Sequence, residues 1–147
     1  MQLILGGARS GKSRLAEQIA QQLAQPVVYV ATAQALDGEM QVRIQHHQQQ
    51  RPEDWGLCEE PTYLAEQLVK LDRPNQTILV DCLTLWMSNL LMHTDPDLQV
   101  QECQKLLDVV GNLQSELILV SNETGLGVVP MGQITRRFVD ETGRLHQ

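Results

Sequence analysis

The sequence has few positive charges for its length. Its 147 residues include 11 Lys and Arg against 18 Asp and Glu, which gives a formal net charge of −7. No run of Lys or Arg offsets this balance, so the electrostatic pattern of a general nucleic-acid binder is missing. We therefore expect no nucleic-acid partner.

The sequence also lacks a long apolar run. No stretch reaches the roughly 18 residues that a membrane-spanning helix needs. The first residues begin a strand-like segment, without the pattern of a signal peptide. We therefore expect no membrane insertion and a cytoplasmic location.

Aromatic residues and cysteines are scarce. Two Trp, two Tyr and one Phe leave the core to Leu, Val, Ile and Met, which suits a parallel sheet covered by helices. Cys58, Cys82 and Cys103 lie far apart, without the paired spacing of a zinc site or a redox motif, and are expected to be ordinary reduced cysteines. With 42% hydrophobic residues, a single domain spanning 1–147 can bury a core without disulfides or metals.

Apolar runs predict buried strands that alternate with helices. The runs are QLIL at 2–5, VVYVAT at 27–32, TILVDC at 77–82 and ELILVSN at 116–122. Helical spacing predicts helices at about 11–24, 37–51, 61–71, 83–92 and 98–113, and a last helix that begins near 133. This alternation indicates right-handed crossovers and an α/β fold with a mostly parallel sheet flanked by helices.

The stretch GGARSGKS satisfies the P-loop pattern G-x-x-x-x-G-K-[ST] and lies between a predicted strand and a predicted helix. Its glycines let backbone N–H groups wrap a phosphate, and the helix presents its positive end. A P-loop alone fixes neither the acceptor nor the outcome, because kinases, nucleotidyltransferases, GTPases and mechanical ATPases share it. The predicted phosphate-binding residues are Gly6, Gly7, Ala8, Arg9, Ser10, Gly11, Lys12 and Ser13.

Asp81 is the candidate second residue of a magnesium site. It ends the apolar strand ILVD, where a neighbouring strand would bring it beside Ser13. A hard cation that keeps several waters favours such oxygen ligands, so Ser13 and Asp81 are the predicted Mg²⁺ residues. The alternative is that Asp81 only caps the following helix.

Adjacent histidines in the stretch RIQHH are the second unusual feature. Neighbours on a helix diverge by about 100 degrees, which disfavours a shared metal. Met40, Ile44 and His47 follow helical spacing, so His47 is predicted to face inward and His46 to face solvent or another subunit. An imidazole can carry a nucleotidyl group as a phosphoramidate, but from the local residues alone a solvated helical face is the favoured explanation of the pair.

Several motifs taken together resemble a known family. They are GGARSGKS, the strand YVAT, the segment EMQVRIQHH with RPEDW after it, DCLTLWMSNLL and SNETGLGVVP. The chain resembles, over nearly its whole length, the bifunctional adenosylcobinamide kinase/adenosylcobinamide-phosphate guanylyltransferase of cobalamin biosynthesis. The resemblance implies a P-loop NTPase-like (RecA-like) fold. Family members continue beyond the GRLHQ segment with more helix and a strand, so we expect the sheet to lack that C-terminal strand.

The resemblance implies two reactions at one nucleotide site. ATP or GTP phosphorylates adenosylcobinamide, and GTP then transfers GMP, through a guanylylated histidine, to adenosylcobinamide phosphate with release of pyrophosphate. His47 is favoured over His46 as the carrier. The family positions that contact the nucleotide correspond to the P-loop and to Ala31, Thr32, Ala33, Gln48, Gln49, Gln50, Arg51, Glu59 and Asp81.

Roles follow for some of these residues. Arg51 would neutralise phosphate charge, and Glu59 would accept hydrogen bonds from a guanine or a ribose, although Glu60 beside it leaves open which carboxylate faces inward. The loop containing Asn122 and Glu123 is expected near the active site, because open α/β sheets bind ligands at the carboxyl ends of their strands. Arg136 and Arg137 would meet phosphate or face solvent.

The resemblance also implies a homotrimer in which a neighbouring subunit borders the site. Two alternatives remain from the residues themselves. One is a simple small-molecule kinase that uses the same P-loop without a histidine intermediate. The other is a GTP-binding regulatory module without transfer activity.

Overall fold

The fold is built on one parallel sheet, described here from a computed structural model for residues 1–34, 52, 54–125 and 130–147. The five strands follow the order β1-β5-β4-β2-β3, and every strand pairing is parallel. The strands are β1 (Gln2–Gly6), β2 (Val27–Ala31), β3 (Gly56–Glu59), β4 (Thr77–Asp81) and β5 (Glu116–Asn122). The predicted α/β fold with a P-loop NTPase-like sheet is confirmed.

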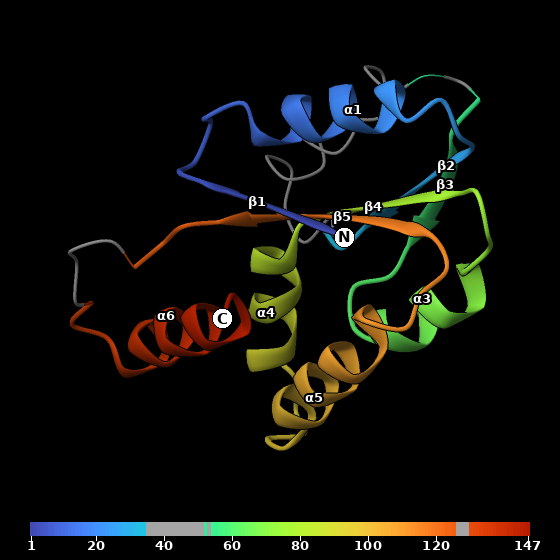
Figure 1. Cartoon of the computed structure of the whole chain (residues 1–147). Helices are drawn as coiled ribbons and strands as arrows, with labels where there is room; N and C mark the ends of the chain where they lie inside the picture. The colour runs from blue at the N-terminus through green and yellow to red at the C-terminus, as the bar shows by residue number, and fades with distance from the viewer. Residues whose placement is uncertain (35–51, 53, 126–129) are drawn as a thin grey trace.

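The helices form two unequal layers. Helix α1 covers one face of the sheet, and the other helices of the described residues pack on the opposite face (Figure 1). Among the described residues, no helix is long and apolar enough to cross a membrane. The helices are α1 (Lys12–Gln22), α3 (Leu64–Leu71), α4 (Leu83–Leu91), α5 (Leu98–Val110) and α6 (Gln133–Leu145).

Alternation along the strands supplies a core on each face. In β4, Ile78 and Val80 face the larger helical layer, whereas Leu79 faces α1. Ala16 and Ala20 of α1 are fully buried, and their small side chains let the helix approach the sheet closely. Central strands buried on both faces explain the near-continuous apolar runs of the sequence.

The predicted runs at 2–5, 27–32, 77–82 and 116–122 are all strands, but the expectation of burial was wrong for β1, an edge strand whose Leu3 and Leu5 are exposed. Strand β3 was missed. Its sequence, GLCE, is mostly exposed and lies at the edge of the sheet, so it has neither a continuous apolar run nor regular alternation. The helix expected at 37–51 lies outside the described residues. Cys58, Cys82 and Cys103 are free thiols, as predicted.

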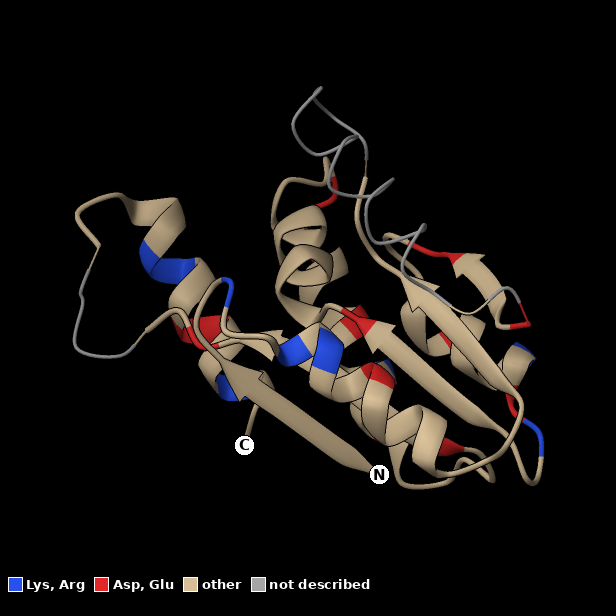
Figure 2. Cartoon of the chain, turned by 90° about the horizontal axis from the view of Figure 1, so that it is seen from above, with Lys and Arg blue, Asp and Glu red and all other residues tan. Residues whose placement is uncertain are grey.

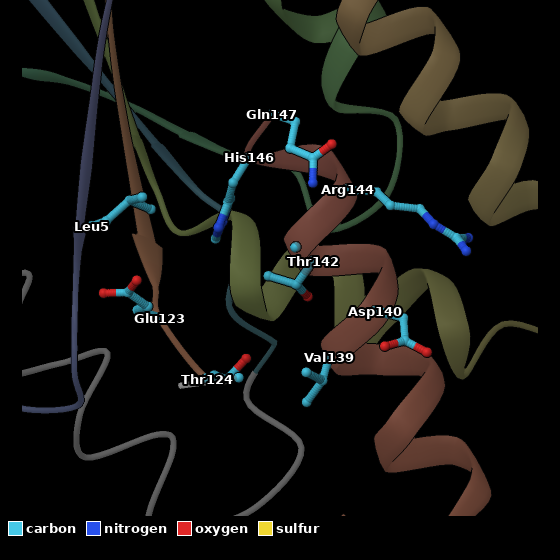
Figure 3. A pocket seen from close by; sticks show the side chains of 11 residues that line it. Leu5, Glu123, Thr124, Val139, Asp140, Thr142, Arg144, His146 and Gln147 are labelled. Atoms are coloured by element: carbon cyan, nitrogen blue, oxygen red, sulfur yellow. The ribbon is translucent and has the colours of Figure 1, made fainter. Parts of the chain in front are cut away.

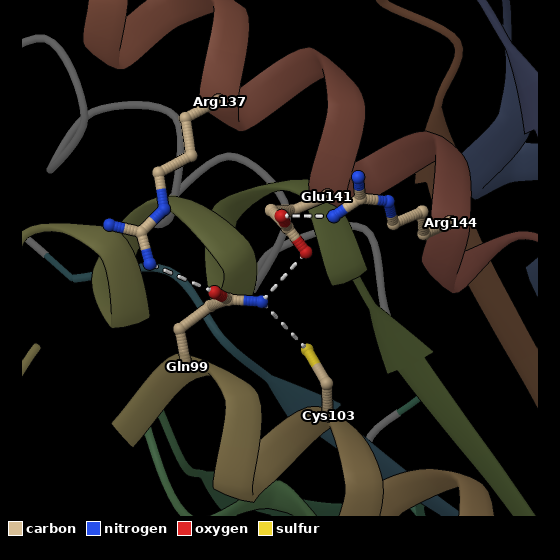
Figure 4. A network of polar contacts seen from close by, with 5 residues as sticks. All are labelled: Gln99, Cys103, Arg137, Glu141 and Arg144. Carbon is tan, nitrogen blue, oxygen red and sulfur yellow. Dashed lines mark hydrogen bonds and ion pairs between the residues drawn. The ribbon is translucent and has the colours of Figure 1, made fainter. Parts of the chain in front are cut away.

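Hydrogen bonds join α5 to α6 (Figure 4). The Gln99 amide accepts a hydrogen bond from Arg137 at 3.3 Å and donates one to Glu141 at 3.2 Å. Glu141 in turn pairs with Arg144 at 2.7 Å. Arg137 is exposed, in line with the solvent-facing alternative, and its guanidinium also donates to Gln99 of α5.

The edge of the sheet at which β4 and β5 begin, the amino edge, is closed by side-chain hydrogen bonds. The Asp72 carboxylate accepts hydrogen bonds from the backbone N–H groups of Gln114 and Ser115 at 2.8–3.1 Å. The Ser115 hydroxyl accepts from the Arg73 N–H and donates to the Arg73 carbonyl. These bonds join the loop before β4 to the loop before β5.

Candidate functional site

The P-loop connects β1 to α1 at the opposite, carboxyl edge of the sheet. Gly11 has φ of 88°, a left-handed conformation that strongly favours glycine. A Cβ on Gly6 would lie 3.0 Å from the Ser10 hydroxyl, so the first glycine allows the loop to fold closely over itself. Lys12 Nζ donates a hydrogen bond to the Gly7 carbonyl at 2.6 Å. The loop is thus already curved into a cradle.

The start of α1 favours a bound anion. Helix α1 has no side-chain cap at its N-terminus, so the N–H groups of its first turn remain available to a ligand. Basic positions gather at this end of the helix, close to an acidic strand end (Figure 2). The predicted phosphate-binding residues from Gly6 to Ser13 therefore lie together in one loop and helix start whose geometry suits an anion.

Asp81 ends β4, but β4 is not the immediate neighbour of β1. The prediction of a neighbouring strand was wrong, because β5 pairs with both β1 and β4 and lies between them. The Asp81 carboxylate shares its face of the sheet with Leu79, which packs in the cluster beneath α1. Asp81 and helix α1, which contains Ser13, consequently lie on the same side of the sheet, where α1 packs across β1, β5 and β4.

The donor chemistry of this pair fits a magnesium ion bound together with a nucleotide. Ser13 offers a hydroxyl and Asp81 a carboxylate, both hard oxygen ligands. No group of three or more His, Cys, Asp or Glu among the described residues could hold a metal alone. Magnesium commonly uses one or two protein oxygens, with phosphate oxygens and water completing its shell, so the pair suits such an ion.

Thr32 anchors the segment that leaves β2. Its buried hydroxyl donates to the Cys82 carbonyl at 2.7 Å and accepts from the Cys82 N–H at 2.9 Å. The Asn89 amide of α4 donates to the Thr32 carbonyl at 2.9 Å and to the Pro61 carbonyl at 3.0 Å. Ala31 to Ala33, predicted from the family resemblance, therefore lie at the carboxyl edge beside the end of β4.

Sequence analysis missed Asn89 as part of this region. In the stretch DCLTLWMSNLL it is a polar side chain on a helix of mainly apolar residues, which is the one signal that marks it. Its amide fixes the distance between the loop after β2 and the loop after β3, because it donates to both. The loop after β2 carries Thr32 and Ala33, and the loop after β3 directly follows Glu59, all of which are expected to contact the nucleotide.

The structure separates the roles of the two adjacent glutamates. Glu60 Oε1 accepts hydrogen bonds from the backbone N–H groups of Thr62 and Tyr63 at 2.9 and 2.7 Å, so this carboxylate stabilises the turn that precedes α3. Glu59 is exposed and makes no side-chain hydrogen bond to another described residue. It pairs in register with Ala31, at the carboxyl end of β3, so Glu59 is the carboxylate available to a ligand.

Asn122 and Glu123 lie against the P-loop, as the position of their loop predicted. Asn122 pairs in register with Gly6, and the Glu123 N–H donates to the Gly6 carbonyl at 3.0 Å. The Asn122 N–H donates to the Thr84 hydroxyl, which is 3.2 Å from the buried Ser121 hydroxyl. The carboxyl end of β5 is therefore fixed to both the P-loop strand and α4.

A cavity of about 530 Å³ opens between this loop and α6 (Figure 3). Its lining includes Leu5, Glu123 and His146. The His146 ring lies 2.7 Å from the Ser121 hydroxyl, and burial lowers the pKa of His146 while the nearby Glu123 carboxylate opposes that shift. His146 is therefore biased toward its neutral form.

The remaining predicted site residues, His46, His47, Gln48, Gln49, Gln50 and Arg51, lie outside the described residues.

Comparison with known proteins gives a consistent result. The model of the cobinamide kinase / cobinamide phosphate guanyltransferase family matches residues 2–147. The chain is 55% identical to the bifunctional adenosylcobalamin biosynthesis protein CobP of Pseudomonas aeruginosa over 145 residues, which are 99% of this chain and 84% of the relative. It is 40% identical to CobU of Escherichia coli and 38% identical to CobU of Salmonella typhimurium, each over 160 aligned residues that cover 100% of this chain and 88% of the relative.

Proposed function

The chain belongs to the family of bifunctional cobinamide kinases and cobinamide phosphate guanyltransferases of cobalamin biosynthesis, and we propose that both reactions use the one P-loop at the carboxyl edge. The observation that carries this proposal is the convergence of the described nucleotide-binding candidates. The P-loop, Ala31 to Ala33, Glu59 and Asp81 come from four different strands, yet all lie at that edge.

In the kinase step, the aminopropanol hydroxyl of adenosylcobinamide attacks the γ-phosphorus of ATP or GTP. The new bond joins that oxygen to phosphorus, the bond to the β-phosphate oxygen breaks, and the hydroxyl proton is released. Backbone N–H groups of the P-loop and Lys12 hold the phosphates and offset the charge that develops during transfer. Lys12 first has to leave the Gly7 carbonyl to which it donates.

In the second step, a histidine attacks the α-phosphorus of GTP, and pyrophosphate leaves. The resulting phosphoramidate is then attacked by a phosphate oxygen of adenosylcobinamide phosphate, which forms adenosylcobinamide-GDP and frees the histidine. We assign the carrier role to His47 rather than His46 because of its place on the apolar stripe of the expected helix. Both residues lie outside the described residues, so this assignment rests on the sequence pattern and the family resemblance.

Ser13 and Asp81 would hold magnesium with the triphosphate. The ion, when bound, neutralises phosphate charge and orients the phosphates for in-line transfer. Glu59 would contact the guanine or the ribose, Gln48 to Arg51 would follow the carrier histidine along the nucleotide, and Arg51 would neutralise phosphate charge. We further propose a cytoplasmic location, from the sequence pattern, and, on the family resemblance, a homotrimer in which a neighbouring subunit borders the site.

Labelling with GTP that is radioactive at the α-phosphate tests the proposal. After denaturation, label that stays on the protein, survives alkali and is lost in acid indicates a histidine phosphoramidate. If GTP binds but no label is retained, the guanylyltransferase mechanism is wrong. Transfer of the γ-phosphate alone would indicate a simple kinase, and binding without any transfer would indicate a regulatory module.

Separate substitutions assign the carrier. His47→Asn should abolish labelling, while His46→Asn should retain it. The opposite pattern would move the carrier role to His46 and leave the bifunctional mechanism intact.

A further inference from the structure

Tyr29 is a buried tyrosine with a functional neighbour. It lies in β2, is only 4% exposed, and packs in the core cluster beneath α1. Its hydroxyl donates a hydrogen bond to Asp81 Oδ2 at 2.8 Å. The two residues are 52 positions apart in the sequence, and the parallel pairing of β2 with β4 brings them together.

The strand register explains why the hydroxyl reaches this carboxylate. Ala31 pairs with Asp81, and Tyr29 precedes Ala31 by two residues, so Tyr29 and Asp81 lie diagonally across the strand pair on one face. The tyrosine ring spans this diagonal beneath α1. Its hydroxyl therefore meets Asp81 from inside the core, on the side away from the open carboxyl edge.

The consequence concerns the two oxygens of Asp81. A carboxylate can accept about four hydrogen bonds, two on each oxygen. The bond from Tyr29 occupies a site on Oδ2 and limits rotation of the carboxylate, which leaves Oδ1 for a cation or its bound water. Carboxylates that serve metal ions are commonly oriented by such outer hydrogen bonds, whose loss weakens metal affinity about 10- to 100-fold.

We propose that Tyr29 is a positioning residue that orients Asp81 toward the magnesium ion of the nucleotide complex. This inference rests on the proposed role of Asp81. It assigns Tyr29 a function that the P-loop pattern does not contain. A tyrosine that only fills the core would need a partner for its hydroxyl but would have no effect on the magnesium dependence of nucleotide binding.

Tyr29→Phe tests the inference, since it keeps the ring and removes the hydroxyl. Binding of a fluorescent GTP analogue is titrated with MgCl₂ in the absence of corrinoid, so the readout does not depend on catalysis. Tyr29→Phe should raise the half-saturating Mg²⁺ concentration about tenfold, with little change in nucleotide binding when EDTA is present. Tyr63→Phe is the matched control, because Tyr63 is the other tyrosine of the chain and is exposed at the start of α3. It should leave the titration unchanged.

Asp81→Asn, alone and combined with Tyr29→Phe, separates the possible outcomes. If the inference is correct, Asp81→Asn itself raises the half-saturating Mg²⁺ concentration. Adding Tyr29→Phe to Asp81→Asn then causes no further rise. If Asp81→Asn raises the half-saturating Mg²⁺ concentration but the value for Tyr29→Phe stays within about twofold of wild type, the positioning role of Tyr29 is overturned and the metal role of Asp81 stands. If Asp81→Asn has no effect, the assignment of Asp81 fails, and the inference about Tyr29 fails with it.

Circular dichroism and binding in EDTA establish that each variant is folded. An effect of Tyr29→Phe that persists undiminished in the Asp81→Asn background would also overturn the inference. In that case the tyrosine would influence binding by a route other than Asp81.

Discussion

The two edges of the sheet differ in what their polar side chains bind. At the amino edge, Asp72 and Ser115 direct their hydrogen bonds to the backbone of the loops they join. At the carboxyl edge, Glu59 has no described side-chain partner, and Lys12 donates only to its own loop. Polar groups of the amino edge that hydrogen-bond within the protein stabilise the fold. Polar groups of the carboxyl edge that have few such bonds are available for a ligand. Substitutions at the two edges should therefore have different effects.

Lys12→Ala should have the largest effect, and on activity alone. Loss of one positioned charge-stabilising donor costs about 10²- to 10³-fold in rate, so phosphorylation of cobinamide should fall by that order. The midpoint of urea unfolding should hardly change, because the described partner of Lys12 is one exposed carbonyl. Lys70→Ala, at an exposed lysine of α3, is the control and should leave the rate unchanged. A large loss of stability in Lys12→Ala would contradict the idea that polar groups of the carboxyl edge serve the ligand and not the fold.

Asn89→Ala should affect both stability and binding, because Asn89 lies between structural and ligand-facing groups. Two carbonyls, of Thr32 and Pro61, lose their donor, and an unsatisfied part-buried group costs about 1–3 kcal/mol. GTP affinity should fall as well, because both loops border the nucleotide site. Urea unfolding and equilibrium binding measure the two effects. Asn112→Ala, which removes an exposed hydrogen bond to the Asp108 carbonyl, is the matched control and should leave GTP affinity unchanged.

Asp72→Asn should affect stability alone, in a pH-dependent manner. Burial acts to raise the pKa of Asp72, but hydrogen bonds from the Gln114 and Ser115 N–H groups outweigh it and hold the pKa below the ordinary value of 3.8. The resulting stabilisation is present above pH 3.8 and is lost as the pH falls through the folded-state pKa.

Urea unfolding of wild type and Asp72→Asn at pH 7 and at pH 3 measures this effect. At pH 7 the free energies of unfolding of wild type and Asp72→Asn should differ by less than those of wild type and Asn89→Ala. At pH 3 the difference between wild type and Asp72→Asn should be smaller still. GTP affinity at pH 7 should be unchanged. If the difference in free energy of unfolding between the two proteins grows on acidification, the ionised Asp72 carboxylate does not stabilise the amino edge.

Glu66→Gln should have the smallest effect. Glu66 and Lys70 form an ion pair at 2.7 Å on the exposed face of α3, and the hydrogen bond from Lys70 lowers the pKa of Glu66. Exposed pairs of this kind contribute little, because water and salt screen them. Neither unfolding nor GTP binding should change measurably. A clear loss of activity would indicate that this face of α3 contributes to the site or to a subunit interface.

Sequence reasoning succeeded where the signal was local. The P-loop was predictable because its glycines, lysine and serine serve one backbone geometry within eight residues. The strands β1, β2, β4 and β5 were predictable because each contains a short apolar run, although β1 is an edge strand in which Leu3 and Leu5 are exposed. Strand β3 was not, since this edge strand has only Leu57 and Cys58 as apolar residues, between Gly56 and Glu59.

Relations between distant segments could not be predicted in this way. The position of β5 between β1 and β4 follows from how the strands pair, which the spacing of Asp81 and Ser13 does not encode. The hydrogen bond between Tyr29 and Asp81 depends on the register of two strands. The different partners of Glu59 and Glu60 depend on the turn at Thr62 and Tyr63 that precedes α3, whereas the sequence placed the start of that helix three residues early, at 61 instead of 64.

The two tryptophans lie in different layers. Trp86 is fully buried in the larger helical layer, and its indole N–H donates to the Thr62 carbonyl at 2.8 Å. Trp55 is partly buried against the cluster beneath α1. The protein thus carries one intrinsic fluorophore for each face of the sheet. Trp86 is bonded to the loop that follows Glu59, so its emission offers a label-free optical signal of events at the carboxyl edge, while Trp55 reports from the opposite layer.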